Sequence, residues 1–300
     1  MVKAMILAAG LGTRLRPLTD ARPKPLVPVA NRPVIDRIIA YLKRNGTQQV
    51  AVNTHHRAGQ MAAFLGHGEA FDTPISVYHE PDILGTAGGL RNAADFWGND
   101  TLIVINGDIL TDIDLTAALD GHRQSGALVT LVLHDCSRFN QILIDAGHAI
   151  RDISTRPHRG RLAFTGIHIV EPGLRNFIPE SGFADIVPCY RRMIRDGHLL
   201  SGHVVRGHYW RDIGTIPSYL LANREHAARA ILLGKGCDLD PSSRVEDWAV
   251  AGTGCRLEPD ASVCRSVLWE GVVVRQGVSI RDSVVTSHRI VERDLIEEAL

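Results

Sequence analysis

The sequence predicts an α/β protein with a mostly parallel, Rossmann-like sheet flanked by helices, followed by a short left-handed parallel β-helix. Strand-like and helix-like segments alternate through the first two thirds of the 300 residues, which is typical of a parallel sheet covered on both sides. The tail repeats with a period of about 17–18 residues, which is typical of a hexapeptide-repeat solenoid. Gly234 and Gly236 separate the two regions, so we predict domains at residues 1–235 and 236–300.

The first predicted strand is Val2–Ala8, a continuous apolar run of the kind found in strands buried on both faces. A helix opens at Pro33 and ends at Gly46, with apolar residues at helical spacing between them. The alternation continues with strands at Val50–Asn53, Ile75–His79, Leu102–Asn106 and Ala127–Leu133, and with helices at Ala58–Leu65 and Ala87–Trp97. Ligands of such sheets lie beyond the carboxyl ends of the strands, so the segments after those ends are the candidates for a site.

A long helix is predicted over residues 216–233, before the tail begins. The tail segments Leu239–Val245, Leu257–Val263 and Val274–Ile280 each place an aliphatic residue six positions after another. In a solenoid these residues point inward, so we expect Leu257, Val263, Val274 and Ile280 to form its core. A chance succession of short strands is the alternative. Residues 294–300 are predicted to form a short helical cap or a frayed end.

Composition excludes several functions. Lysine plus arginine and aspartate plus glutamate both number 33, so the formal net charge is zero, and we expect neither nucleic acid nor a membrane surface as a partner. The five cysteines lack metal-ligand spacing, which favours free thiols and a cytoplasmic location over disulfides or a zinc site. The apolar start is too short to span a bilayer.

The strongest functional signal is the loop Ala8-Ala-Gly-Leu-Gly-Thr-Arg14, followed by Pro23-Lys24-Pro25. A glycine-rich loop after a buried strand lets backbone N–H groups approach phosphate oxygens closely. It is not a Walker A loop, because no Gly-Lys-Ser/Thr follows, and not a dinucleotide fingerprint, because Leu15 replaces the third glycine. Arg14 can fork across two phosphate oxygens, and Lys24 can act as a point charge. A tight turn with surface cations is the alternative.

A second flexible loop contains Gly85, Thr86 and Gly88 and leads into a helix. Its backbone groups could read the edge of a nucleotide base. Glu80, at the start of this segment, could accept hydrogen bonds from guanine, or it could be a solvated loop acid.

Two acidic turns are candidates for metal binding. Asp108 follows the strand that ends at Asn106, where a carboxylate would point into the ligand crevice. Asp212 lies in a later turn and could be an ordinary turn acid or the N-cap of the helix that follows. Two hard oxygen ligands suit Mg²⁺, which keeps its other positions for water and phosphate. The residues alone do not bring the two acids together.

Taken together, these segments resemble the sugar-1-phosphate nucleotidylyltransferase family, in particular mannose-1-phosphate guanylyltransferase-like enzymes. The resemblance covers essentially the whole chain and includes Gly10–Arg14 with Pro23–Pro25, Glu80–Gly88, Asn106–Asp108, Phe164–Ile167 and Trp210–Thr215. It implies catalytic roles for Arg14 and Lys24 and a Mg²⁺ site at Asp108 and Asp212. It also implies nucleotide binding by Ala8, Gly10, Gly12, Thr13, Glu80, Gly85, Thr86 and Gly88, and sugar-phosphate binding by Asn106, Arg156 and Gly166.

One segment departs from the family pattern. Members commonly have Glu-Lys-Pro before the Phe-Thr-Gly strand, whereas this chain reads Ser154-Thr-Arg-Pro157. Arg156 can still meet a phosphate, or it is only a surface cation, but Thr155 cannot replace a carboxylate that accepts from sugar hydroxyls. An unusual sugar is one reading of this change. His168, which closely follows Gly166, is expected to face the sugar or to be structural.

The predicted reaction joins a nucleoside triphosphate to a sugar-1-phosphate and releases pyrophosphate. Guanylyl transfer to mannose-1-phosphate or a related sugar is favoured slightly, with uridylyl or thymidylyl transfer possible. The alternatives are a non-catalytic regulatory paralogue that binds nucleotide-sugars and a bifunctional enzyme with an acyltransferase tail. Trp248 and Trp269 fall near the corners of the solenoid, which favours packing of the tail against another subunit or the catalytic domain. We therefore expect a homo-oligomer, and expect deletion of residues 236–300 to yield monomer with the Gly10–Lys24 loop intact.

Overall fold

A twisted sheet that contains a group of parallel strands forms the centre of residues 3–204. The computed structural model describes residues 2–300 and divides them into two compact units, Met1–Gly10 with Ile38–Trp210, and Leu11–Arg37 with Arg211–Leu300. Among the described residues of the first unit, nine strands form one sheet in the order β10-β9-β11-β6-β1-β4-β5, with β8 between β11 and β12. These strands are β1 Lys3–Leu7, β4 Gln49–Thr54, β5 Ile75–His79, β6 Leu102–Asn106, β8 Val129–His134, β9 Asn140–Ile144, β10 Ile150–Ile153, β11 Leu162–Val170 and β12 Leu200–Val204.

The sheet is parallel on one side of β11 and mixed on the other. Strands β4, β5 and β6 run parallel to β1 in one unbroken group, and β12 runs parallel to β8. Strand β11 is antiparallel to β6, β8 and β9, and β9 is antiparallel to β10. The predicted α/β class with a mostly parallel central sheet is confirmed, and the parallel group brings four carboxyl ends to one edge.

Helices bury one face of the sheet in a continuous core. Alternate strand residues, such as Met5, Val104 and Leu131, pack with Leu90 and Tyr190 from two helices. The helices and short helical turns are α2 Val34–Arg44, α3 Ala58–Leu65, α4 Gly85–Asn92, α5 Ala94–Trp97, α6 Leu115–Ser125, α7 Ile186–Arg195, η3 Glu69–Phe71 and η4 Pro172–Phe177. The strand residues that point to the opposite face, including Ala4, Ile6, Val50 and Val52, are also buried, as expected for a sheet covered on both sides. The short strand β7 Ile109–Thr111 follows β6.

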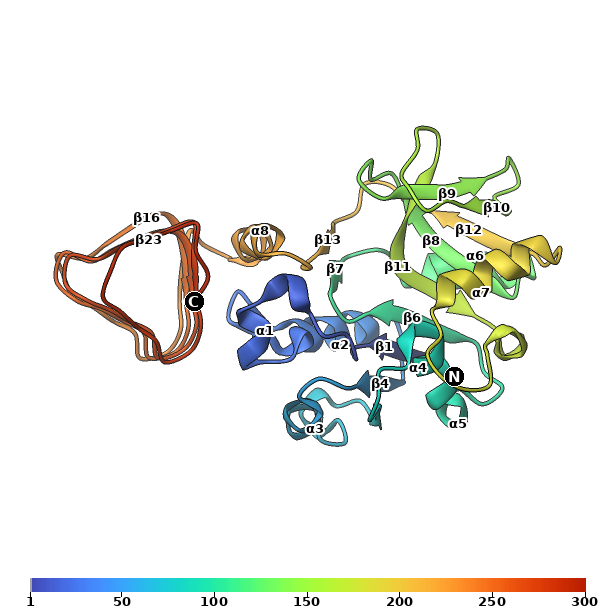
Figure 1. Cartoon of the computed structure of the whole chain (residues 1–300), viewed down its shortest axis with the longest axis horizontal. Coiled ribbons are helices and arrows are strands. Elements are labelled where there is room, and N and C mark those ends of the chain that lie inside the picture. Colours follow the sequence, from blue (N-terminus) through green and yellow to red (C-terminus); the bar gives the residue numbers. More distant parts are fainter. Residues whose placement is uncertain (1) are drawn as a thin grey trace. The chain divides into compact units, whose positions relative to one another are not determined.

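The second unit joins an early segment of the chain to its tail. The early segment contains η1 Thr13–Leu15, α1 Leu18–Ala21, η2 Lys24–Leu26 and the small hairpin of β2 Pro28–Val29 and β3 Arg32–Pro33. From Arg211 the chain completes β13 Trp210–Asp212 and forms α8 Ile216–His226, which packs against β2, β16 and β18. Figure 1 shows α1 and α8 beside the tail.

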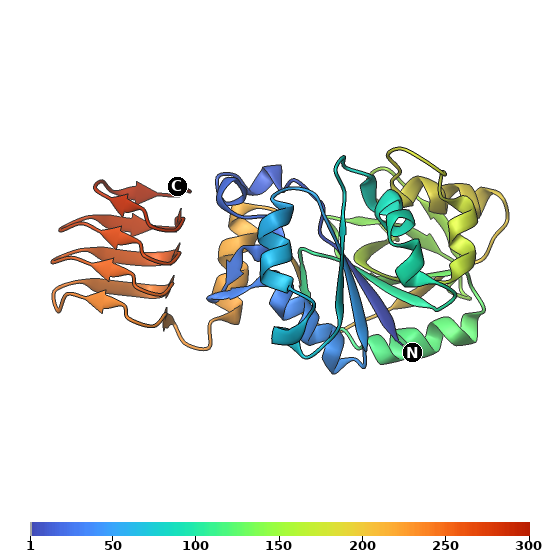
Figure 2. The ribbon, with the colours of Figure 1, turned by 90° about the horizontal axis from the view of Figure 1, so that it is seen from below.

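Ten short parallel strands coil into a three-sided solenoid, seen end-on in Figure 1 and from the side in Figure 2. They are β14 Ile231–Leu233, β15 Asp238–Leu239, β16 Arg244–Ala251, β17 Arg256–Leu257, β18 Ser262–Leu268, β19 Val273–Val274, β20 Ser279–Arg281, β21 Val284–Val285, β22 Ile290–Val291 and β23 Leu295–Ile296. Leu257 pairs with Val274, and Val263 pairs with Ile280. All four side chains are buried in one apolar core, so the predicted repeat register is confirmed.

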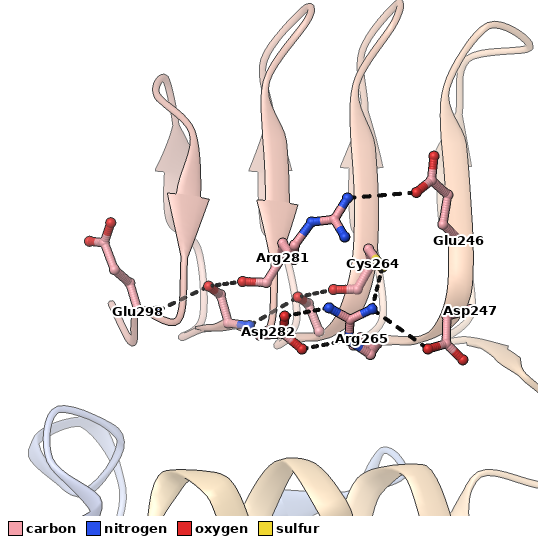
Figure 3. A network of polar contacts seen from close by, with 9 residues as sticks. Glu246, Asp247, Cys264, Arg265, Arg281, Asp282 and Glu298 are labelled. Atoms are coloured by element: carbon pink, nitrogen blue, oxygen red, sulfur yellow. Dashed lines mark hydrogen bonds and ion pairs between the residues drawn. The ribbon is translucent and has the colours of Figure 1, made fainter.

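Polar side chains also stack along one corner of the solenoid (Figure 3). Arg265 donates to both oxygens of Asp282 at 2.6 Å and lies 3.8 Å from Asp247 in the coil before. Beneath them, the buried Ser266 hydroxyl accepts the Ser283 N–H at 3.0 Å. Each coil is thus tied to the next by side chains as well as by strand pairing.

Two sequence predictions were wrong at this level. The helix predicted over residues 216–233 ends at His226, and Ile231–Leu233 instead begins the solenoid by pairing with β16. The end of the chain is not a helical cap, because Leu295–Ile296 adds a strand that pairs with β20. In both places a neighbouring strand supplied hydrogen bonds that local helix propensity could not outweigh.

Candidate active site

The predicted site residues divide between the two units. Most lie in the first unit, namely Ala8, Gly10, Glu80, Gly85, Thr86, Gly88, Asn106, Asp108, Arg156 and Gly166. The second unit holds Gly12, Thr13, Arg14, Lys24 and Asp212.

A chain of polar contacts crosses the carboxyl ends of β5, β4 and β1. The Leu84 N–H donates to Glu80 Oε2 at 3.0 Å, and Asn53 Nδ2 donates to Glu80 Oε1 at 2.7 Å. Asn53 Oδ1 accepts the Ala8 N–H at 2.7 Å. The end of β1, where the glycine-rich loop starts, is therefore held in register with the loop that follows β5.

The role predicted for Glu80 as a base-reading residue does not fit this geometry. Its side chain is fully buried, and both carboxylate oxygens accept hydrogen bonds from within the protein. A buried carboxylate that lost these partners would pay a large desolvation cost. Glu80 is instead placed to position the loop. Asn53 was missed by the sequence analysis, although an asparagine at the end of an apolar strand was a visible signal.

The loop after Glu80 is tied to the start of α7. The Ala87 and Gly88 N–H groups both donate to the Ala184 carbonyl, at 2.9 and 3.0 Å, and Thr86 Oγ1 accepts the Ile186 N–H at 2.8 Å. Gly85 has a φ of +76°, and a Cβ there would lie 2.6 Å from the Ala184 carbonyl oxygen. These residues have packing roles in addition to any contact with a nucleotide, which stays a prediction.

Gly89 was also missed. A Cβ at this position would lie 2.6 Å from Asn53 Nδ2 and 3.0 Å from Glu80 Oε1. Helix α4 can therefore approach the polar chain only because position 89 has no side chain.

The turn after β6 brings three predicted residues together. The Gly107 N–H donates to the Leu7 carbonyl at 2.8 Å, so this turn lies against the end of β1. Gly166 on β11 has a φ of +80°, and a Cβ there would lie 2.8 Å from Asn106 Nδ2. Asp108 follows at once and is half-buried. Gly166 thus lies against Asn106 at the turn that carries Asp108, and the roles of these three residues in binding stay a prediction.

Arg156 lies elsewhere in this unit, on the loop between β10 and β11. Its side chain is exposed, and its carbonyl accepts the Ser154 hydroxyl. The Ser154 carbonyl in turn accepts Arg191 Nη2 at 3.1 Å. The loop backbone is therefore fixed while the Arg156 guanidinium stays open to solvent.

In the second unit, Gly12 sets the shape of the glycine-rich loop. It has a φ of +66°, and its carbonyl accepts the Thr19 hydroxyl at 3.0 Å and the Leu15 N–H at 2.9 Å. A Cβ at Gly12 would lie 2.7 Å from Thr19 Cγ2 and 3.3 Å from Lys24 Cβ. A side chain at residue 12 would therefore clash with Thr19 and crowd Lys24, while Thr13 and Arg14 are exposed.

Arg14 and Asp212 converge at Gly214. A Cβ at Gly214 would lie 2.7 Å from Asp212 Oδ2 and 3.0 Å from Arg14 Nη2. Asp212 is not the N-cap of α8, because Thr215 takes that place and its hydroxyl accepts the Ser218 N–H at 3.4 Å. The Asp212 carboxylate is thus not needed to cap the helix, which leaves it available for binding.

A pocket of roughly 400 Å³ in the first unit is lined by His134, Asp135, Cys136, Val205, Arg206, Gly207, His208 and Trp210. Trp210 Nε1 donates to the Thr165 carbonyl at 2.8 Å, so the pocket adjoins the residue before Gly166. His134 Nδ1 lies 3.2 Å from His208 Nε2. Burial, and secondarily the His208 ring, lowers the pKa of His134 to about 4, so His134 is neutral at neutral pH, whereas Asp135 and Arg206 add charged groups to the lining. The sequence analysis did not predict this pocket.

His168 does not face a sugar. Its ring is buried, bonds to the Tyr190 hydroxyl and contacts Phe164 edge-on. Burial lowers the pKa of His168 to about 3. It is a neutral histidine of the core, which is the structural role considered from the sequence.

The comparison with known proteins defines the class of this site. Residues 3–229 match the nucleotidyl transferase family. The chain is 35% identical over 219 residues to the N-acetylmuramate α-1-phosphate uridylyltransferase of Neisseria meningitidis, covering 72% of this chain and 94% of that one. It is 32% identical over 250 residues to the UTP–glucose-1-phosphate uridylyltransferase of Synechocystis, where it covers 77% of this chain and 64% of that protein.

Two further relatives extend the match. The mannose-1-phosphate guanylyltransferase of Mycobacterium tuberculosis is 29% identical over 299 residues, covering 93% of this chain and 83% of that protein. A Bacillus anthracis structure, provisionally assigned as a glucose-1-phosphate thymidylyltransferase, superposes with a TM-score of 0.68 at 25% identity, over 76% of this chain and 96% of that one.

The class is therefore that of the sugar-1-phosphate nucleotidylyltransferases, as predicted, and these relatives differ in the nucleotide they transfer. The chain belongs to the nucleotidyl transferase family. The relatives reported above are named as transferases of nucleotidyl groups, not as regulatory paralogues or acyltransferases. Among residues 2–300, every helix is too short or too polar to cross a lipid bilayer.

Proposed function

We propose that this chain transfers a guanylyl group to mannose-1-phosphate or a related sugar-1-phosphate. The Mycobacterium tuberculosis guanylyltransferase supports this choice, because its match extends over 93% of the chain and so includes much of the tail. Uridylyl and thymidylyl transfer are the alternatives, since relatives with those activities also match. Glu80 gives no support for guanine, because its carboxylate is engaged within the protein.

The observation that carries the proposal is the convergence of Arg14 and Asp212 at Gly214, in the unit that also holds Lys24. Transfer to a phosphate nucleophile requires alignment and neutralisation of several negative charges, with little covalent chemistry from the protein. A forked cation, a point charge and a carboxylate that can bind a metal supply those requirements.

The reaction needs no general base, because the sugar phosphate is already an anionic nucleophile. One of its oxygens forms a bond to the α-phosphorus, and the bond from that phosphorus to the oxygen shared with the β-phosphate breaks. The electron pair leaves with pyrophosphate. We assign Arg14 to the charge that develops on pyrophosphate, and Lys24 and Arg156 to the attacking phosphate. Ala8, Gly10, Gly12 and Thr13 would present backbone groups to the triphosphate.

Family members generally use a divalent metal ion. Within residues 2–300, no group of three or more histidine, cysteine or acidic side chains could enclose a metal. Two carboxylates instead fit Mg²⁺, which usually keeps several waters and takes further oxygens from substrate phosphates. We propose that Asp108 and Asp212 bind Mg²⁺. When bound, the ion supplies positive charge to the phosphate oxygens that react.

The sugar is proposed to lie near Asn106 and Gly166 and to extend toward the pocket of His134, His208 and Trp210. The hydrogen bond from Trp210 to Thr165 supports this placement, because it joins the pocket to the residue before Gly166. A lining with an aromatic ring, histidines and the charged side chains of Asp135 and Arg206 suits a sugar ring and its hydroxyls.

The test is a matrix of nucleoside triphosphates against sugar-1-phosphates, with pyrophosphate release as the readout. Guanosine triphosphate with mannose-1-phosphate is expected to give the highest kcat/KM. A higher value for a uridine or thymidine nucleotide would reassign the base. No release with any pair would remove the proposed function.

Four further assignments are part of the proposal. We place the protein in the cytoplasm, consistent with its five free cysteines. The solenoid is proposed to be left-handed, and the functional boundary is placed between residues 235 and 236. A homo-oligomer is proposed as the assembly.

A further inference from the structure

Arg22 connects the solenoid to the loop that carries Lys24. Its guanidinium lies over the Trp269 ring, with Cζ 4.7 Å from the ring centroid. It also forms an ion pair with Glu270 and donates to Ser287 Oγ at 2.7 Å. All three partners belong to the solenoid, whereas Arg22 follows α1 and precedes Lys24 by two residues. The connection therefore reaches the immediate neighbourhood of a proposed catalytic side chain.

The contact is built as a partly buried anchor. Trp269 is almost completely buried, and the Arg22 side chain is 26% exposed. Ser287 Oγ also donates to Glu270 Oε1 at 2.7 Å, so the partners of Arg22 are held by one another. A guanidinium stacked on indole and paired with a carboxylate keeps one orientation better than an exposed ion pair does.

The other side of Lys24 is fixed to the same tryptophan. Trp269 Nε1 donates to the Tyr219 hydroxyl at 2.9 Å, and that hydroxyl donates to the Pro28 carbonyl at 2.6 Å. Lys24 therefore lies between two attached positions of the chain. The Arg22 side chain contacts Trp269 directly, and the Pro28 carbonyl is connected to Trp269 through the Tyr219 hydroxyl.

Two asparagines extend this attachment. Asn223 on α8 accepts the Ala30 N–H at 2.8 Å, and Asn31 Nδ2 donates to the Ala251 carbonyl of the solenoid at 2.8 Å. The segment from Arg22 to Asn31 is thus bound along its length by α8 and the solenoid.

We propose that Arg22 is a positioning residue, and that the solenoid acts through Arg22 and Trp269 to set the position of Lys24. The inference rests on the role proposed for Lys24. It changes the expectation that deletion of residues 236–300 would leave the Gly10–Lys24 loop intact, because that deletion removes Trp269, Glu270 and Ser287. The part of the tail that contacts Arg22, namely Trp269, Glu270 and Ser287, thus supports catalysis by holding Arg22 in place.

The test compares Arg22→Ala with Arg265→Ala in the full-length protein. Arg265 is a matched control, because its side chain is 35% exposed and it also pairs with a carboxylate, but both Arg265 and its partners Asp282 and Asp247 lie within the solenoid. Kinetics with both substrates and thermal unfolding are measured for each. Arg22→Ala is expected to lower kcat/KM for the sugar-1-phosphate by about 10- to 100-fold, the size expected for misplacement of about 1 Å.

Arg22→Lys is expected to restore part of this loss, because an ammonium can also lie over Trp269 and pair with Glu270. Arg265→Ala is expected to keep normal kinetics even where its unfolding temperature falls. Normal kinetics of Arg22→Ala would overturn the inference, and so would an equal kinetic loss in Arg265→Ala.

A double-mutant cycle separates this inference from the proposed function. If Arg22 acts through Lys24, the variant with both Arg22→Ala and Lys24→Ala should lose no more activity than Lys24→Ala alone. Additive losses would overturn the inference. Normal activity of Lys24→Ala would instead remove the role proposed for Lys24, and an inactive wild-type protein would remove the proposed function itself.

Discussion

Asp108 lies in a turn, whereas Asp212, which was expected in a turn, is the last residue of the short strand β13. Both residues are only half-buried, so their charge can be changed with little effect on packing. Asp108→Asn and Asp212→Asn should each lower turnover by at least about 100-fold, because the metal and the phosphates around it lose a charged oxygen ligand. Pyrophosphate release measures turnover, and circular dichroism confirms that each variant is folded. Near-normal turnover in either variant would remove that residue from the metal site.

Gly166→Ala tests the contact between β11 and Asn106. Alanine at a φ of +80° costs about 1–2 kcal/mol of stability, and its Cβ would also meet Asn106 Nδ2. Gly126 is a matched control, because it has a φ of +64° and open space where a Cβ would lie. We expect urea unfolding to show both variants to be less stable than the wild-type protein, Gly166→Ala by the larger amount because of the contact with Asn106, and kcat/KM to fall only in Gly166→Ala. A loss shared by Gly126→Ala would contradict the proposed role of the contact.

The sequence predicted the loops of the candidate site, but it did not predict the residues that hold these loops in place. The loops with Arg14, Asn106 and Asp108 have their own residue patterns. Asn53 and Gly89 do not, because their importance depends on the register of β4 against β1 and on the approach of α4. Glu80 was predicted to contact the base because the sequence does not show that it is buried. Its burial depends on a partner far away in the sequence, Asn53.

Strand β11 and helix α7 enclose a neutral histidine, which makes the stability of this pair of elements sensitive to acid. The pKa of His168 is lowered from 6.5 to about 3 by burial, so the unfolded chain binds a proton there more readily. The stability that the neutral, buried His168 contributes is complete above pH 6.5 and is lost as the pH falls toward 3.

We therefore expect the free energy of unfolding to fall by up to about 1.4 kcal/mol per pH unit for this one group below pH 6.5. Urea titrations at pH 7.0 and 5.5 measure the change. His168→Phe should be less stable at pH 7.0, because the Tyr190 hydroxyl loses its partner, but its stability should depend less steeply on pH. An unchanged slope would contradict a buried neutral His168.

Several elements of the sheet region were predicted with their exact bounds, and elements completed by a neighbouring strand were not. The helix at Ala58–Leu65 and the strands at Ile75–His79 and Leu102–Asn106 have the predicted bounds. Ile231–Leu233 and Leu295–Ile296 became strands because an adjacent coil offered a partner. Local sequence does not contain that information.

At the scale of the whole molecule, the burial of Trp269 in the tail needs no contact with another subunit. Trp269 is buried by contacts with Arg22 and Tyr219 in the same chain. Exposed apolar residues remain on the solenoid, at 55% exposure for Ile290 and 63% for Ile296. These residues are the better argument for the proposed homo-oligomer.

We expect the full-length protein to sediment as a dimer or larger assembly at micromolar concentration. The variant Ile296→Glu should shift it toward monomer, because a charge on an apolar contact opposes association. Leu143→Glu is the control, since Leu143 is also exposed but lies on β9 of the sheet. A strictly monomeric full-length protein would end the oligomer proposal.

The second unit joins two segments that are far apart in the sequence, and this affects when it can form during biosynthesis. Residues 11–37 leave the ribosome well before residues 211–300, the segment that packs with them, have been made. At roughly 5–20 residues per second, the interval between the two is on the order of 10–50 s. During that time the loop with Arg14 and Lys24 has none of its contacts with α8 or the solenoid. A nascent chain therefore has a nearly complete sheet before this loop gains its contacts, and we expect activity only after residues 211–300 have been made.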